Sequence, residues 1–152
     1  MFGSCEVNVN WKNTKPHSHP YEAFRSETSL RVNLGYNKHE VQTNDRRQQG
    51  GVMSLIHGEM CSHLSEQGQD TTGLGQWTWS LFRGKHGVKT RIFTGYRPCK
   101  TGPHQLRSTY QQQRQFLRHN GRENTCPQQA FNQDILHEIK NSRLNGERVV
   151  LM

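Results

Sequence analysis

Residues 76 to 96 constrain the fold most strongly, because apolar and polar side chains alternate on both sides of a glycine-containing turn. In "WTWSLFRG", Trp77, Trp79 and Leu81 alternate with Thr78 and Ser80, which is the two-residue period of a half-buried strand. The segment "GKHG" then supplies a turn, and "KTRIFTGY" returns as a second strand. We therefore expect an antiparallel hairpin with both tryptophans on one face.

Strand patterns also precede this hairpin. The segment "GGVMSLIHG" predicts a strand entered through two glycines, and "TSLRVNLGY" alternates enough for another. "GLGQ" reads as a turn before the Trp77 strand, since it lacks the lysine and the strand-loop-helix context of a phosphate-binding loop. Residues 13–49 are otherwise polar and poorly patterned, which predicts loops or loosely packed surface in "KNTKPHSHP" and "NKHEVQTNDRRQQ".

Two helices are predicted after the hairpin. Ser108 or Thr109 can cap the first, "TYQQQRQFLRHN". The second, "CPQQAFNQDILHEIKNSR", has Pro127 near its first turn. Its apolar residues recur every four positions and form one face, while Asp134 is expected to be a solvated carboxylate on the polar side. The residues of that apolar face are Phe131, Ile135 and Ile139.

The sequence given ends in an unbroken apolar run, "GERVVLM". Such a run predicts a strand buried in the middle of a sheet, and together with the preceding strands and helices it indicates a layered α/β domain. A central strand leaves its neighbours with unpaired backbone groups, so we expect this sequence to be part of a larger domain.

The charge balance favours polyanionic partners. The chain carries 20 Lys and Arg against 12 Asp and Glu, a net charge of +8, and only 30% of its 152 residues are hydrophobic. A soluble basic surface without a partner explains the charge equally well. The four cysteines form no C-x-x-C pair and no apolar run resembles a signal peptide or membrane span, so an intracellular, thiol-reduced protein without membrane association is expected.

The cysteine and histidine spacing does not predict a structural zinc site. The pairs His17 with His19 and Cys61 with His63 are two-ligand fragments, not the paired spacing of a structural zinc site.

A series of segments carries a resemblance to a known family. In order along the chain they are "CEVNVNW", the glycines 50 and 51, "DTTGLGQWTW", "RGK", "RIFTGYRPC", "STYQQQ", "CPQQAFNQDI" and "GERVVLM". Their order and spacing resemble the endonuclease/exonuclease/phosphatase superfamily, most closely the domains of retroelement (retrotransposon) open reading frames. The chain departs from the family at Gln76, where Arg is frequent, and at Gly95, where Ala is usual.

The resemblance implies a fold and a set of site residues. The fold is a partial four-layer α/β sandwich, with a strand carrying Glu6 in residues 1–12, the polar segment 13–49, and the sheet and helices of the partial domain in 50–152. Glu6 matches the metal-binding carboxylate, Tyr96 the active-site aromatic residue, and Arg97 could add a phosphate contact. In the family, the strand matching "VVLM" leads into an Asp-x-Asn pair, and a later segment supplies the water-activating Asp and His. The resemblance thus implies that the sequence stops before the second half of the domain.

Two classes of function remain open. The resemblance implies a fragment of a Mg²⁺-dependent nucleic-acid phosphodiesterase, endonuclease-like, acting on DNA in preference to RNA and inactive by itself. The alternative is a non-catalytic, basic nucleic-acid-binding remnant of a retroelement, and a third possibility is a product with no function. The residues alone favour an exposed terminal carboxylate for Glu6 and a core or rim tyrosine for Tyr96, and they leave Arg97 equally open to being a solvated side chain before Pro98.

Overall fold

The computed structural model describes residues 1–11, 14–15, 18–24, 26–39, 48–105 and 108–152. Its strands form a three-stranded sheet in the order β1-β3-β2 and a four-stranded sheet in the order β4-β5-β6-β7. All neighbouring strands are antiparallel except β6 and β7, which are parallel. The strands are β1 (Phe2–Cys5), β2 (Leu30–Gly35), β3 (Val52–His57), β4 (Leu64–Gln69), β5 (Trp77–Arg83), β6 (Lys89–Gly95) and β7 (Arg148–Leu151).

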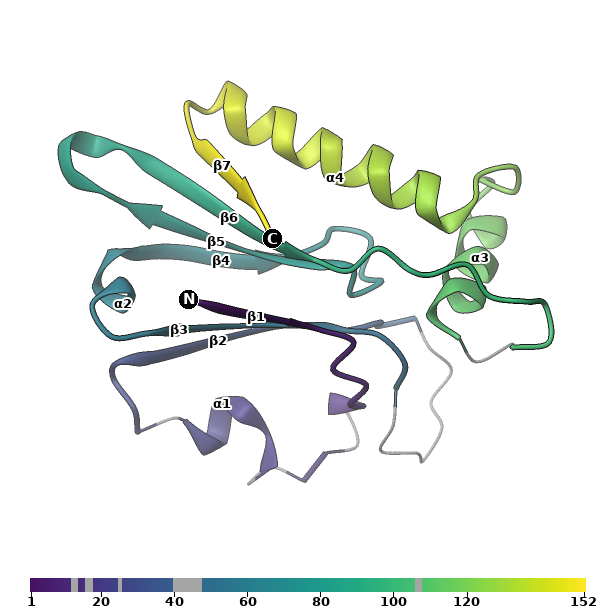
Figure 1. Cartoon of the computed structure of the whole chain (residues 1–152), viewed down its shortest axis with the longest axis horizontal. Coiled ribbons are helices and arrows are strands. Elements are labelled where there is room, and N and C mark those ends of the chain that lie inside the picture. Colours follow the sequence, from purple (N-terminus) through teal and green to yellow (C-terminus); the bar gives the residue numbers. More distant parts are fainter. Residues whose placement is uncertain (12–13, 16–17, 25, 40–47, 106–107) are drawn as a thin grey trace.

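The two sheets lie face to face, with helices on their outer sides (Figure 1). The long helix α4 covers the outer face of the four-stranded sheet and the short helix α1 lies against the outer face of the other. The predicted α/β fold is confirmed. The helices are α1 (Pro20–Ala23), α2 (Met60–His63), α3 (Thr109–His119) and α4 (Pro127–Leu144), and a 3₁₀ turn spans Lys85–Gly87. No described helix is both long and apolar enough to cross a membrane.

The predicted hairpin is confirmed as β5 and β6. Its register pairs Trp77 with Gly95 and Trp79 with Phe93, and both tryptophans pack toward α4. The predicted helix starts are confirmed too. The Ser108 hydroxyl accepts a hydrogen bond from the Gln111 N–H at the start of α3, and Pro127 occupies the first turn of α4.

An aromatic core lies between the four-stranded sheet and α4. Trp77 and Phe131 meet edge to face with ring centroids 5.8 Å apart, and Phe93 and Ile135 complete the buried cluster. Ile139 is partly buried against it, so the predicted apolar face of α4 is the packed one. Burial of such side chains contributes about 1.5–3 kcal/mol each, and this layer therefore supplies much of the hydrophobic stabilisation.

A buried ion pair fixes the start of β7 against β6. The Arg91 guanidinium donates to both oxygens of the Glu147 carboxylate at 2.6 and 3.0 Å, and it lies 4.0 Å from the ring centroid of Trp79. The bond from Arg91 lowers the pKa of Glu147, so this carboxylate stays ionised and paired at neutral pH. The parallel pairing of β6 and β7 is thus reinforced by a side-chain clamp at its first residues.

Strand β7 has one partner strand in the structure. The run Val149–Met152, expected in the middle of a sheet of a larger domain, pairs with β6 and with no other described strand, so its central position stays a prediction. Val150, Leu151 and Met152 are each about half exposed. An unbroken apolar run indicates a strand but does not by itself fix its place in the sheet.

The polar segment 13–49 is only partly described. It contains α1 and β2, the latter in the predicted "TSLRVNLGY" region, and residues 12–13, 16–17, 25 and 40–47 lie outside the described residues. The predicted loop in "NKHEVQTNDRRQQ" therefore falls mostly outside them.

Candidate functional site

The ends of β1 and β6 bring two of the predicted site residues into contact. Glu6 directly follows β1 and Tyr96 directly follows β6, and the Tyr96 hydroxyl donates a hydrogen bond to the Glu6 carboxylate. These residues are 90 positions apart and their strands belong to different sheets. The contact therefore depends on how the two sheets are stacked.

The backbone around Glu6 is held in an uncommon conformation. Glu6 and Asn8 both have φ of 55°, a region that residues other than glycine seldom adopt. Asn8 and Gly50 form two hydrogen bonds with each other. The Asn8 N–H donates to the Gly50 carbonyl at 2.9 Å, and the Gly50 N–H donates to the Asn8 side-chain oxygen at 3.0 Å. Gly50 and Gly51 have φ of 86°, which explains the paired glycines in the sequence. Such locally constrained backbone is frequent at functional sites.

The close approach of the sheets places β1 against β6. A Cβ atom on Gly3 would lie 2.6 Å from the Thr94 methyl carbon, so only glycine fits there. Two residues further along β1, the Cys5 thiol donates to the Gly95 carbonyl at 3.3 Å. Sequence reasoning did not identify Gly3, Cys5 or Asn8 as part of this edge, although the quoted motif "CEVNVNW" contains the last two.

The environment of Tyr96 keeps its hydroxyl protonated. Burial raises its pKa well above the ordinary value, and the hydrogen bond and negative charge of Glu6 raise it further. At neutral pH the phenol is consequently a hydrogen-bond donor, suited to an anionic oxygen, and not a base or a nucleophile.

Arg97 is less firmly placed. Its side chain is exposed and forms no hydrogen bond or ion pair with a described residue. The chain beside it is anchored, because Pro98 is buried and its carbonyl accepts from the Gln128 side chain at 3.2 Å. Arg97 thus follows Tyr96 in the chain, but no hydrogen bond or ion pair connects its side chain to Glu6 or Tyr96.

The donor set at this edge fits a hard cation only minimally. Mg²⁺ prefers oxygen ligands and is commonly held by one or two carboxylates together with substrate phosphates. Glu6 offers an exposed carboxylate, but within the described part of the chain no group of three or more His, Cys, Asp or Glu could hold a metal. Glu6 could therefore hold Mg²⁺ weakly, with water and phosphate as the remaining ligands.

The cysteine and histidine pairs have other contacts. The Cys61 thiol donates to the Ser29 carbonyl at 3.1 Å, His63 lies 3.1 Å from the Arg83 carbonyl, and His19 accepts from the backbone N–H of Tyr21. His17 lies outside the described residues.

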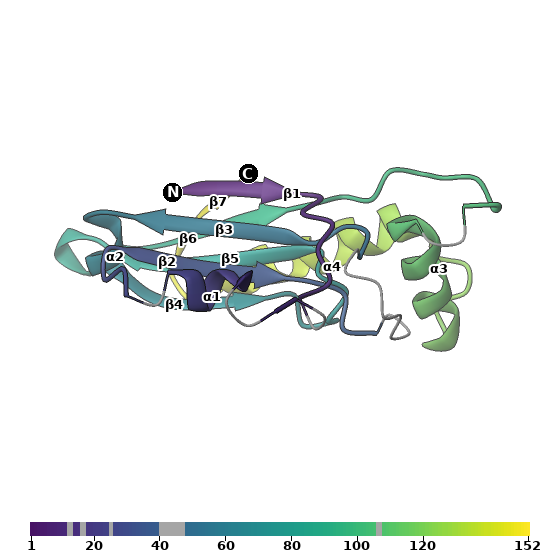
Figure 2. The ribbon, with the colours of Figure 1, turned by 90° about the horizontal axis from the view of Figure 1, so that it is seen from below.

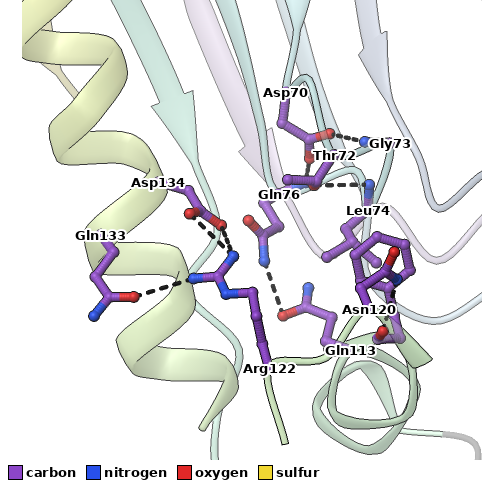
Figure 3. A network of polar contacts seen from close by, with 11 residues as sticks. Asp70, Thr72, Gly73, Leu74, Gln76, Gln113, Asn120, Arg122, Gln133 and Asp134 are labelled. Atoms are coloured by element: carbon purple, nitrogen blue, oxygen red, sulfur yellow. Dashed lines mark hydrogen bonds and ion pairs between the residues drawn. The ribbon is translucent and has the colours of Figure 1, made fainter. Parts of the chain in front are cut away.

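A second polar network supports the loop before Trp77 (Figure 3). The buried Asp70 carboxylate accepts from the backbone N–H groups of Gly73 and Gln76, and burial raises its pKa. Gln76 in turn donates through its side chain to Gln113 of α3 at 3.1 Å. Arg is frequent at the position of Gln76 in the family that the sequence resembles. Here the neutral Gln76 side chain connects the loop to α3 by a hydrogen bond.

A separate set of contacts in the same view shows that Asp134 is paired with an arginine. Both of its carboxylate oxygens lie 3.2 Å from the Arg122 guanidinium, which also donates to Gln133 (Figure 3). The expected solvated carboxylate is wrong for Asp134, because the turn after α3 brings Arg122 onto α4. The role of this residue is to fasten that turn.

Comparison of the chain with protein-family models, with curated proteins and with solved structures finds no match. The assignment of function therefore depends on the geometry of the Glu6–Tyr96 edge.

Proposed function

We propose that the Glu6–Tyr96 edge is the metal- and phosphate-binding side of a Mg²⁺-dependent nucleic-acid phosphodiesterase site. The observation that carries the proposal is the contact between the Tyr96 hydroxyl and the Glu6 carboxylate. The resemblance assigned these residues separate roles, and the contact unites them at one edge. A net charge of +8 supports a polyanionic substrate, and DNA is favoured over RNA only by the resemblance.

Each residue has a defined part in this proposal. The Glu6 carboxylate supplies the hard oxygen ligand, and Mg²⁺, when bound, neutralises charge on a phosphoryl oxygen. Tyr96 remains protonated, and its single O–H, which donates to Glu6 in this structure, would turn to a phosphate oxygen when the Glu6 carboxylate is engaged by the metal. Arg97, exposed and next to Tyr96 in the chain, would add a charge-assisted contact. These groups bind and orient a phosphodiester, and none of them activates water.

Cleavage by residues 1–152 alone is therefore not expected. No hydrogen bond or ion pair joins a described histidine to Glu6 or Tyr96. Loss of a general base alone typically lowers the rate by ~10²–10⁴-fold. In plasmid-nicking and abasic-duplex assays with Mg²⁺, the chain should leave both substrates intact. Cleavage that Glu6→Gln and Tyr96→Phe both abolish would show that these residues hold a complete site.

Mg²⁺-dependent binding of a phosphodiester tests the proposal directly. We expect Mg²⁺, at constant ionic strength, to strengthen binding of a short fluorescent DNA to the parent chain and to have no such effect on Glu6→Gln. Tyr96→Phe should weaken binding in Mg²⁺ by about 2–10-fold, the contribution of one ordinary hydrogen bond. Glu123→Gln, which neutralises an exposed carboxylate elsewhere, is the matched control. An equal response to Mg²⁺ in Glu6→Gln and the parent would refute the proposal.

A further inference from the structure

The hairpin turn between β5 and β6 lies at the start of β6, whereas Tyr96 directly follows the other end of that strand. Seven strand steps separate Lys89 from Tyr96, which corresponds to roughly 22–24 Å at the rise of a β-strand. The turn has a fixed shape. The Gly84 N–H donates to the Val88 carbonyl at 2.7 Å, and His86 and Gly87 adopt φ of 57° and 74°.

Several cationic side chains lie at the hairpin end of the four-stranded sheet, and their arrangement does not stabilise the sheet. Arg83 and Lys89 are direct cross-strand partners, and like charges in that relation destabilise a sheet. Lys85 lies in the turn between them, and Arg148 opens β7 beside the same end of β6, opposite Thr90. We call these four residues the basic hairpin end: Arg83, Lys85, Lys89 and Arg148, all exposed.

The charges of the basic hairpin end are not neutralised by the described part of the protein. None of its four residues forms an ion pair with a described carboxylate. Glu147, which precedes Arg148 and is near enough to Lys89 for that charge to lower its pKa, is already engaged by Arg91. The repulsion between the cations is thus left for a partner to relieve.

We propose that the basic hairpin end binds the phosphate backbone of nucleic acid, at a point separate from the Glu6–Tyr96 edge. The choice of nucleic acid rests on the proposed function, but the contact requires neither Glu6 nor a metal. An anionic membrane surface is the competing partner that the test must separate from DNA. Residues 83–89 contribute no exposed large apolar side chain that could anchor in a membrane, whereas Leu144 and Val150, near Arg148 in the chain, are exposed.

Backbone contacts predict a particular salt dependence. Each phosphate neutralised on duplex DNA contributes about −0.9 to the slope of log K against log salt concentration. Binding by the parent should be weak, micromolar or above, and largely independent of sequence, since phosphates carry no sequence information.

The test uses residues 1–152 and a fluorescent DNA duplex in EDTA, so that metal plays no part. We expect Lys85→Gln with Lys89→Gln to weaken binding about tenfold and to reduce the magnitude of the salt slope by about 2. The matched control is Arg114→Gln with Arg118→Gln, which removes the same charge from exposed positions on α3. The control should leave the slope nearly unchanged. Thermal unfolding curves of both double variants serve as the control that each protein is folded.

Several results would overturn the proposal. Equal slopes for the two double variants would assign binding to net charge alone, and absence of duplex binding by the parent at low salt would remove the partner. Binding to vesicles of phosphatidylcholine and phosphatidylserine that the hairpin variant loses, with DNA binding unaltered, would assign the surface to lipid. Glu6→Gln should retain the parental salt slope in EDTA. The EDTA experiment therefore tests the basic hairpin end independently of the proposed metal site, and either proposal can fail without the other.

Discussion

The two faces of the four-stranded sheet are built from different chemistry. The face toward α4 is aromatic, with Trp77 and Phe93 fully buried, whereas the face toward the other sheet carries the small polar side chains of Thr78 and Ser80 beside buried Phe82. There the Ser54 and Thr78 hydroxyls meet at 2.6 Å, and the Asn33 side chain donates to two backbone carbonyls of β4 and β5. One face gains hydrophobic burial, and the other allows two backbones to approach closely.

The close approach of the sheets determines how near Glu6 lies to Tyr96. Figure 2 shows β1 at the edge of its sheet on the same side as β6 and β7, and Gly3 packs against Thr94 in that region. Larger residues between the sheets would move β1 away from β6 and separate Glu6 from Tyr96. The polar interface therefore positions the candidate site, while the aromatic layer supplies the stability that this positioning requires.

Removal of an aromatic side chain from the α4 face should have the largest effect. Phe93 has no exposed surface, and Phe93→Ala is expected to lower the free energy of unfolding by about 3–5 kcal/mol through lost burial and a residual cavity. Urea unfolding followed by circular dichroism measures it. Leu144→Ala, at a side chain that is 85% exposed, is the control and should change stability by less than about 0.5 kcal/mol. A loss below about 1 kcal/mol for Phe93→Ala would contradict the stabilising role of this layer.

A methyl group added between the sheets tests their close approach. Gly3→Ala should destabilise the protein by about 1–3 kcal/mol, because the new Cβ would overlap the Thr94 side chain. Thr94→Ala should restore most of that loss in the double variant, since it removes the overlapping atoms, and the Thr94 hydroxyl has no hydrogen-bond partner to lose. Additive effects in this double-mutant cycle would show that the two residues do not limit the spacing.

The paired hydroxyls of the polar interface allow a finer test. Ser54→Ala should cost about 1–2 kcal/mol, because the buried Thr78 hydroxyl is left without its partner. The double change Ser54→Ala with Thr78→Val removes both hydroxyls and should be nearly neutral. Chemical denaturation of the parent and the two variants measures these effects. A double variant less stable than Ser54→Ala would mean that the two hydroxyls do more in this interface than bond to each other.

The smallest expected effect is a gain at the aromatic face. A Cβ atom on Gly95 would lie 3.4 Å from Phe131 and 3.6 Å from Ile135, in ordinary contact. Gly95→Ala should therefore raise the free energy of unfolding by about 0.4–1 kcal/mol through a less flexible unfolded chain. Gly68→Ala is the opposing control, because its Cβ would lie 2.4 Å from the Trp79 ring. If Gly95→Ala destabilises the protein, the packing described around this strand end is wrong.

The sequence predicted the elements whose apolar pattern is regular. The β5–β6 hairpin and helices α3 and α4 alternate or repeat clearly, so their type and approximate bounds follow from periodicity. Strand β4 was missed for a physical reason. Its Gln67 faces the polar interface and donates to Ser80, and its Gly68 lies under the Trp79 ring, so the strand shows no apolar period.

The candidate site was only partly predictable. Glu6, Tyr96 and Arg97 were identified through a family resemblance that the comparisons do not test, and neither spacing nor composition could bring together residues 90 positions apart. The contact depends on sheet stacking, which in turn depends on small residues such as Gly3 that carry little signal in the sequence. The positive φ of Glu6 was likewise not readable from its residue type.

The central claim is that the stacked sheets create a cation- and phosphate-binding edge at Glu6 and Tyr96. Mn²⁺ takes the same oxygen ligands as Mg²⁺ and broadens nuclear magnetic resonance signals close to it, so a titration of isotope-labelled protein with Mn²⁺ tests this directly. The account predicts that the amide signals of Cys5, Glu6 and Tyr96 broaden first and that Glu6→Gln removes this selectivity. Signals that broaden first elsewhere, or a pattern that Glu6→Gln leaves unchanged, would contradict it.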